Sequence, residues 1–179
     1  MVLTTKDMLV VIKLFCQGDE PWTQGQLAQE IGLAPSQVSY SLARLAAARL
    51  FNKTLRSVVR PALEEFLIHG VKYAFPAQRG GVTRGLPTAY AVPPLSDLIR
   101  QPDEPPPVWP TVHGTVRGYA FEPLDEHVPA AALRDGRLYE LFALVDALRM
   151  GDAREREIAR ALIAESMVES FATSNGSNP

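Results

Sequence analysis

The chain has 179 residues, of which 46% are hydrophobic and 21% are charged, a composition typical of soluble globular proteins. It has no apolar run approaching the roughly 20 residues that span a bilayer, and Lys6 and Asp7 interrupt the N-terminal segment, which argues against a signal peptide. Cys16 is the only cysteine, so an internal disulfide is excluded and we expect a cytoplasmic protein.

The net charge of −2 conceals an uneven distribution along the chain. Residues 1–100 carry eleven Lys or Arg against seven Asp or Glu, whereas residues 101–179 carry seven against thirteen, so the two parts have net charges of +4 and −6. Residues 33–84 are the most basic, with eight Lys or Arg against two Glu. A basic segment of this kind favours contact with nucleic acid phosphates; the alternative is a solvated basic surface that binds nothing.

Apolar spacing and capping signals predict three helices in the first fifty residues. The spacing indicates a first helix over Thr5–Cys16. Further along, Thr23 and Gln26 have the spacing of a capping box, and Gly32 suits the left-handed residue that ends a helix. Pro35 is favoured in the first turn of the helix that follows. The segment therefore predicts a pair of short helices joined by a tight turn.

The second helix of this pair has one apolar face and one polar face. Val38, Leu42 and Leu45 recur at helical spacing and are expected to pack against the preceding helix. We expect this helix to continue to about Arg49. The polar residues left on its other faces are Ser36, Gln37, Ser39, Tyr40 and Arg44.

The segments LAQEIGL, PSQVS and SLARLAAARLF resemble the helix-turn-helix of winged-helix transcriptional regulators, particularly the multiple-antibiotic-resistance regulator group. The resemblance implies a mainly α fold with a small β-hairpin, in which the second helix of the motif enters the major groove of DNA. It assigns a phosphate contact to Arg44, while Ala34 departs from the Ser or Thr that is usual at this cap. The implied base-reading residues are Ser36, Gln37, Ser39 and Tyr40.

The segment after this helix only partly fits a winged fold. Leu50-Phe51 matches the short strand that follows the recognition helix, and Lys53 and Arg56 place basic charge close to it for phosphate contacts. No wing is expected directly afterwards, because Ser57–Tyr73 has helical spacing from Pro61 onward.

We predict instead a displaced wing over Gln78–Arg84. The flanking segments 72–75 and 88–91 alternate like strands, and a glycine pair between them permits a turn. Arg79 and Arg84 are then expected to reach a minor groove or phosphates. The alternative is a surface loop ordered by its own backbone.

Proline is concentrated between residues 76 and 110, where nine of the fifteen prolines lie. The run PDEPPPVWP, residues 102–110, predicts an extended linker with little regular structure, anchored at one end by Trp109. We therefore predict four regions, namely a winged helix-turn-helix DNA-binding domain over residues 1–100, a Pro-rich linker over 101–115, an acidic helical region for dimerisation or partner binding over 116–172, and a disordered tail over 173–179.

Two more helices are predicted near the C-terminus, over Gly136–Met150 and Ala153–Phe171. Asp152 and Glu155 have the spacing of a further capping box. Each helix carries an apolar stripe, and a pair of helices cannot bury both stripes alone. We therefore expect this acidic pair to pack on the first domain or on another chain.

The sequence offers little for catalysis. The three histidines His69, His113 and His127 are far apart, and no CxxC, HxH or HExxH spacing supports a metal site. The chain also lacks a GxSxG motif and a phosphate-binding loop with GK[ST]. We therefore expect no enzymatic activity, no metal and no cofactor.

These observations favour a sequence-specific regulator that binds double-stranded DNA as a homodimer and represses transcription by occluding its operator. A second hypothesis is an adaptor or antitoxin-like protein whose C-terminal helices bind a partner protein, with DNA binding serving autoregulation; residues 136–157 are similar to small regulators encoded beside nucleotidyltransferase-type genes. A third is release from DNA by a ligand bound between the domains. A helical hairpin that contacts protein instead of DNA is the remaining alternative.

Overall fold

The computed structural model describes the backbone of residues 2–174 and the side chains of residues 2–169. The described chain is mainly helical, with one two-stranded and one three-stranded sheet. In chain order the elements are α1 (Thr5–Gln17), α2 (Gln24–Ile31), α3 (Pro35–Ala47), β1 (Phe51–Asn52), β2 (Ser57–Val58), α4 (Arg60–Glu65), the π-helix η1 (Phe66–Gly70), α5 (Val71–Ala74), β3 (Arg79–Pro87), the 3₁₀-helix η2 (Ala89–Ala91), α6 (Leu95–Leu98), β4 (Pro107–Pro110), β5 (Val116–Phe121), α7 (Val128–Ala132), α8 (Gly136–Met150) and α9 (Ala153–Ser174).

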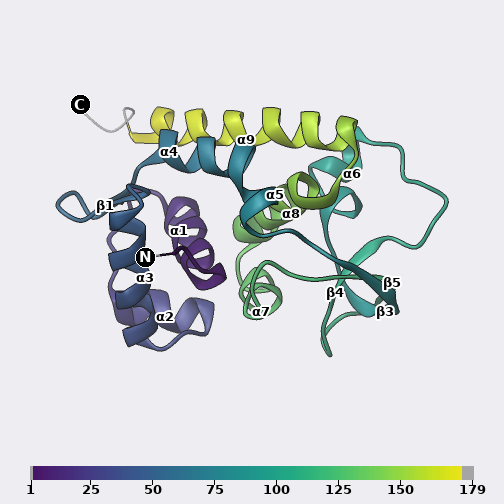
Figure 1. Cartoon of the computed structure of the whole chain (residues 1–179), viewed down its shortest axis with the longest axis horizontal. Coiled ribbons are helices and arrows are strands. Elements are labelled where there is room, and N and C mark those ends of the chain that lie inside the picture. The colour runs from purple at the N-terminus through teal and green to yellow at the C-terminus, as the bar shows by residue number, and fades with distance from the viewer. Residues whose placement is uncertain (1, 175–179) are drawn as a thin grey trace.

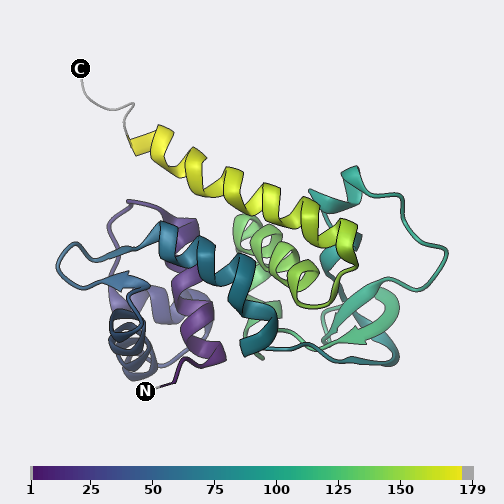
Figure 2. The same cartoon turned by 45° about the horizontal axis from the view of Figure 1, so that its top comes forward.

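The elements are spread along one long axis of the molecule. Figure 1 shows α1, α2 and α3 at one end with β1 beside them, and β3, β4 and β5 at the opposite end. Helix α8 lies between these two ends, and α9 runs along one side of the molecule, past α4 and α8 (Figures 1 and 2). The two ends are therefore available for different contacts.

The predicted capping of the first helices is confirmed. The Thr23 hydroxyl accepts a hydrogen bond from the Gln26 N–H at 3.1 Å, and the Gln26 side chain accepts from the Thr23 N–H at 3.2 Å. Gly32 ends α2 in the left-handed conformation, with φ of 75°. Helix α3 begins at Pro35, as expected, and ends at Ala47, slightly earlier than expected.

A short antiparallel hairpin, β1–β2, follows α3 directly, although the sequence analysis expected no wing there. Phe51 pairs with Val58, and Asn52 pairs with Ser57. The Asn52 carboxamide oxygen accepts from the N–H groups of Thr54 and Leu55 at 2.9 and 3.0 Å. This side chain closes the turn locally, so the hairpin does not depend on a glycine or on a long alternating pattern.

The helix predicted from Pro61 is confirmed, but it extends further than expected. Helices α4, η1 and α5 follow one another without a break from Arg60 to Ala74. Segment 72–75, which was predicted to be a strand, is therefore mostly helical. Phe75, at the end of this segment, is half-buried and continues the helical face of Leu63, Leu67 and Val71, which are fully buried, so helical packing outweighs the short alternation.

The displaced wing predicted over Gln78–Arg84 is wrong. Residues 79–84 of this segment lie within the single strand β3, which passes through Gly80-Gly81 without turning, and segment 88–91 contains the 3₁₀-helix η2. The pairing between β3 and β5 shifts register between Arg79 and Val82. The glycine pair therefore occupies an irregularity in a strand, not a turn.

The Pro-rich segment is part of the sheet, so the extended linker predicted over residues 101–115 is wrong for its central part. Strand β4 pairs antiparallel with β3 and parallel with β5, while β3 and β5 also pair, so the three strands close on one another. A Cβ at Gly85 or Gly118 would overlap the carbonyl oxygens of Trp109 and Pro106. The small sheet closes because two of its strands carry glycine at the points of closest approach.

One hydrophobic cluster joins the N-terminal helices, the sheet and the C-terminal helices. It runs from Met8 in α1 through Trp109 in β4 to Met167 in α9. Every residue from Leu141 to Arg149 of α8 is buried. The apolar stripes of the two predicted C-terminal helices therefore pack within the chain. Of the predicted disordered tail, residues 173–174 belong to α9 and residues 175–179 lie outside the described part.

A buried polar cluster fastens the sheet to α8. The Asp146 carboxylate accepts hydrogen bonds from the Thr88 hydroxyl at 2.8 Å, from the Trp109 indole N–H at 2.7 Å and from Arg149 at 2.8 Å. Arg149 also donates to the carbonyl oxygens of Phe75 and Glu122. These bonds connect segments that are far apart in sequence, and they satisfy charged groups that are otherwise costly to bury.

Candidate nucleic-acid interface

Helix α3 presents one polar face to solvent and buries the other. Ser36, Gln37, Ser39 and Tyr40 are all exposed, and the Tyr40 side chain reaches an exposed fraction of 67%. On the opposite face Val38, Leu42 and Leu45 are buried in the core. The four residues predicted to read bases are therefore together on the accessible side of α3, a helix that lies toward the left end of the molecule in Figure 1.

Gln37 also has a role within its own helix. Its side-chain oxygen accepts a hydrogen bond from the N–H of Ala34 at 2.9 Å. Ala34 has no side-chain oxygen to cap the helix, so this bond supplies half of a capping box. Among the described residues the Gln37 Nε2 group has no hydrogen-bond partner, so the amide can still donate outward.

Arg44, to which the sequence-based prediction assigned a phosphate contact, also forms hydrogen bonds within the fold. Its Nε and Nη2 atoms donate to the two carboxylate oxygens of Asp7 at 2.7–3.0 Å, and Nη2 also donates to the Ser41 hydroxyl at 3.4 Å. Asp7 is fully buried. A bidentate pair of this kind fixes the orientation of α3 on α1. Arg44 therefore stabilises the position of the exposed polar face of α3.

The hydrogen bonds to Asp7 set its ionisation. Burial acts to raise the pKa of Asp7, but hydrogen bonds from Arg44, from the Thr4 N–H and from Ser41 outweigh it and lower the pKa below the ordinary value of 3.8. The unfolded chain therefore binds this proton more readily than the folded chain does. The contribution of Asp7 to stability is complete at neutral pH and is lost as the pH falls through its folded pKa.

We predict that Asp7→Asn makes folding less sensitive to acid. The free energy of unfolding, measured with urea at several pH values between 7 and 3, is expected to fall less steeply for the variant than for the native chain, because one carboxylate with a lowered pKa is absent. Asp7→Asn is also expected to be less stable at pH 7, where Arg44 loses a charged partner. Asp103→Asn, at an exposed position, is the control, and parallel curves for Asp7→Asn and the native chain would contradict the assignment.

The hairpin β1–β2 carries the basic residues of this surface. Lys53 and Arg56 are exposed in its turn. The Arg56 guanidinium lies 4.5 Å from the centre of the Trp22 ring, and it donates to the Trp22 carbonyl oxygen at 3.3 Å. Stacking on an indole holds the position of a cation without neutralising its charge. Lys53 and Arg56 therefore keep the basic character that the sequence analysis predicted for them.

A groove of 340 Å³ joins the hairpin to α3. Ser39 lies on its α3 side, Lys53 and Arg56 lie on its hairpin side, and Trp22 and Gln24 lie between them. The polar helix face and the basic hairpin thus form one continuous surface, which we call the recognition surface. Trp22 and Gln24 were missed as members of it, although the position of Gln24 at the start of a helix in the predicted pair was a usable signal.

Arg79 and Arg84 lie away from the recognition surface, so their assignment to a wing is wrong. Both belong to β3, at the end of the molecule opposite α3 (Figure 1). Arg79 lies 3.7 Å from the centre of the Tyr119 ring and 3.4 Å from the Glu104 carboxylate. Arg84 pairs across the sheet with Arg117. The strand pairings place these cations on a different part of the protein.

Other chemistry is sparse in the described residues. No group of three or more His, Cys, Asp or Glu side chains within residues 2–169 has a geometry suited to a metal ion. Burial raises the pKa of the Cys16 thiol to about 12, so the thiol is protonated at neutral pH and packs as a small apolar group. None of the helices that the structure describes has the length and apolar character needed to cross a membrane.

Comparison of this chain with known protein families, with characterised proteins and with solved structures found no significant match.

Proposed function

We propose that this protein is a winged helix-turn-helix regulator that binds specific sequences in double-stranded DNA. Helix α3 would enter the major groove, and the hairpin β1–β2 would act as the wing that contacts phosphates. The observation that carries the proposal is the recognition surface itself, in which the exposed polar face of α3 adjoins Lys53 and Arg56 across a groove. Polar side chains that read base edges, flanked by cations that meet phosphates, are the two components of specific DNA binding.

The charge and burial of the rest of the chain agree with this orientation. Residues 101–179, which carry the net charge of −6, contribute their helices to the shared core, and the Asp7–Arg44 pair holds α3 against α1. We propose that the protein acts as a homodimeric repressor by occluding its operator, with half-sites about 34 Å apart. The partner-protein alternative needs C-terminal helices that are open to another protein, and α8 buries its apolar stripe inside the chain.

The direct test is selection of binding sequences from a random duplex library by the full-length protein. We expect an enriched sequence with two half-sites related by a dyad. Fluorescence anisotropy with that duplex should show affinity that falls with increasing salt, because each phosphate contact releases counterions. Failure to enrich any sequence, or affinity that is indifferent to both sequence and salt, would contradict the proposal.

A substitution in the hairpin separates the proposed wing from the rejected one. Lys53→Ala is expected to weaken binding to all duplexes by a similar factor and to reduce the slope of log affinity against log salt by about 1, because one phosphate contact is lost. Arg84→Ala removes an exposed cation from the opposite end of the molecule and is expected to change neither quantity. Equal effects of the two substitutions on affinity and on the salt slope would contradict the assignment of the hairpin β1–β2 as the DNA-binding wing.

A further inference from the structure

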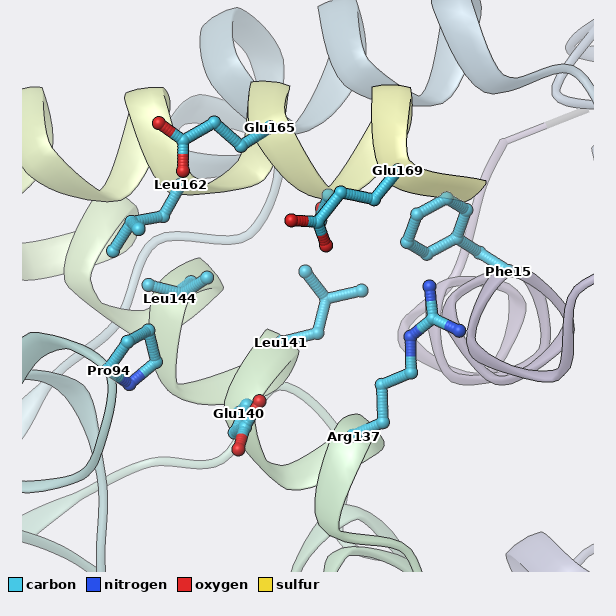
Figure 3. A pocket seen from close by; sticks show the side chains of 10 residues that line it. Phe15, Pro94, Arg137, Glu140, Leu141, Leu144, Leu162, Glu165 and Glu169 are labelled. Atoms are coloured by element: carbon cyan, nitrogen blue, oxygen red, sulfur yellow. The ribbon is translucent and has the colours of Figure 1, made fainter. Parts of the chain in front are cut away.

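A pocket of 690 Å³ lies between helices α8 and α9, with the end of α1 at one side. Figure 3 shows α8 below the pocket, α9 above it, the end of α1 at one side and Pro94 at the other. Leu141 and Leu144 project into it from α8, Leu162 projects from α9, and the Phe15 ring closes the α1 side. This apolar interior is suited to the hydrophobic part of a compact small-molecule ligand.

The charges around the pocket are predominantly negative. Glu140, Glu165 and Glu169 line it, against one cation, Arg137. In the region whose side chains are described, residues 2–169, neither Glu140 nor Glu165 has an ion-pair or hydrogen-bond partner. In Figure 3 the Glu169 carboxylate extends from α9 toward Leu141.

Arg137 keeps its positive charge, but its position is fixed by contacts within the protein, and the three glutamates outnumber it. Its Nη1 group donates to the Cys16 carbonyl oxygen at 3.1 Å, and its guanidinium lies 5.6 Å from the centre of the Phe15 ring. These contacts attach the start of α8 to the end of α1. The arginine is thus held by the protein, whereas Glu140 and Glu165 remain available to a ligand.

We propose that this pocket binds an organic cation with a bulky apolar body, and that this ligand regulates the affinity for DNA. The leucines and Phe15 would enclose the apolar body, and Glu140 and Glu165 would face its positive charge. The attraction between a carboxylate and a cation is stronger beside an apolar, poorly hydrated surface than in open water, because the effective dielectric constant there is lower. The binding half of this inference is independent of DNA, and the regulatory half rests on the proposed function.

The position of the pocket provides a connection to the recognition surface. Phe15 belongs to α1, the helix whose Asp7 holds α3 through Arg44. On the other side α9 packs against α4, which begins shortly after β2 of the hairpin. A ligand that separates α8 from α9 therefore acts on elements that support both α3 and the wing.

The binding test uses the full-length protein without DNA and two probes of similar shape and opposite charge, tetraphenylphosphonium and tetraphenylborate. Isothermal titration calorimetry is expected to show saturable binding of one tetraphenylphosphonium per chain, weakened by salt, and no comparable binding of tetraphenylborate. Equal or tighter binding of tetraphenylborate would overturn the proposal in favour of an anionic ligand paired with Arg137. Absence of saturable binding of either probe would overturn it entirely.

Matched variants locate the site. Glu140→Gln with Glu165→Gln is expected to weaken tetraphenylphosphonium binding by about tenfold, since two partly screened charge contacts are lost. Glu20→Gln with Glu157→Gln removes the same charge at exposed positions outside the pocket and is expected to leave affinity nearly unchanged. An equal loss in both double variants would show attraction by net charge alone and overturn the site. Within residues 2–169, none of these four carboxylates takes part in an ion pair, and thermal melting checks that each variant is folded.

The regulatory half is tested with the duplex selected for the native protein. We expect tetraphenylphosphonium to change DNA affinity by about fivefold or more, and DNA to change affinity for the probe by the same factor, as reciprocal coupling requires. Probe binding without any effect on DNA affinity would overturn the regulatory half. Probe binding by a protein that selects no DNA sequence would refute the proposed function while leaving the cation site in place.

Discussion

Asp146→Ala is expected to destabilise the protein by about 3–5 kcal/mol, the usual cost of removing one partner from a buried ion pair. The Asp146 side chain is 1% exposed and that of Arg149 is 3% exposed. Without the carboxylate, the Arg149 charge is buried without a counter-charge, and the Trp109 N–H and the Thr88 hydroxyl lose their acceptor. A loss of this size is a large part of the roughly 5–15 kcal/mol that stabilises a typical domain. Urea unfolding followed by circular dichroism measures it.

Two further variants separate charge from hydrogen bonding at this site. Asp146→Asn keeps an acceptor and nearly the same volume, so its loss of stability should be smaller than that of Asp146→Ala. Asp146→Leu combined with Arg149→Met replaces the pair by apolar groups and should recover much of the loss, since the desolvation of both charges is also removed. A loss below about 1 kcal/mol for Asp146→Ala would mean that the cluster is not a principal connection between the sheet and α8.

Gln37→Glu is expected to weaken DNA binding by at least about tenfold, in line with the roughly 1–3 kcal/mol that a good base contact provides. The substitution replaces an amide donor by a carboxylate on the face of α3 that is proposed to enter the major groove. It keeps the oxygen that accepts from the Ala34 N–H, and a negative charge in the first turn of a helix is favourable. Stability is therefore expected to be unchanged or slightly increased while DNA affinity falls.

The opposite directions of the two effects make this variant informative. Fluorescence anisotropy with the selected duplex gives the affinity, and thermal melting gives the stability. Gln78→Glu introduces the same charge at an exposed position beside β3 and serves as the control. Undiminished DNA affinity in Gln37→Glu would remove α3 from the interface, whatever the result for the wing.

Much of the N-terminal half could be predicted because its signals are local. The capping boxes, the Gly32 helix end and the Pro35 helix start each involve residues within a few positions of one another, and the structure contains all of them. The helical spacing of the apolar residues in α3 likewise indicated which face of the helix is buried. The hairpin β1–β2 was missed although its signal is local too, because one Asn52 side chain forms the turn and no strand pattern announces it.

The errors in the second half arise from contacts between distant segments. The pattern around Gly80-Gly81 resembles a hairpin when residues 72–91 are considered alone. The structure pairs β3 with β4 and β5 instead, and Trp109 of the Pro-rich segment is fully buried. Strand β3 pairs with residues that lie 21 to 42 positions further along the chain, and partners this distant leave no periodic signal in either strand, so propensity alone favoured the wrong pairing.

The sequence by itself determined the capping of the first helices, the polar face of α3 and the segregation of charge, since each depends on residue type and on neighbours one or two turns away. Tertiary structure decided which of those residues are available for contact. Arg44 bonds to Asp7, 37 positions earlier in the chain, and Arg79 and Arg84 lie at the end of the molecule away from α3. The pocket between α1, α8 and α9 also exists only once these helices have packed together, because none of them encloses a volume alone.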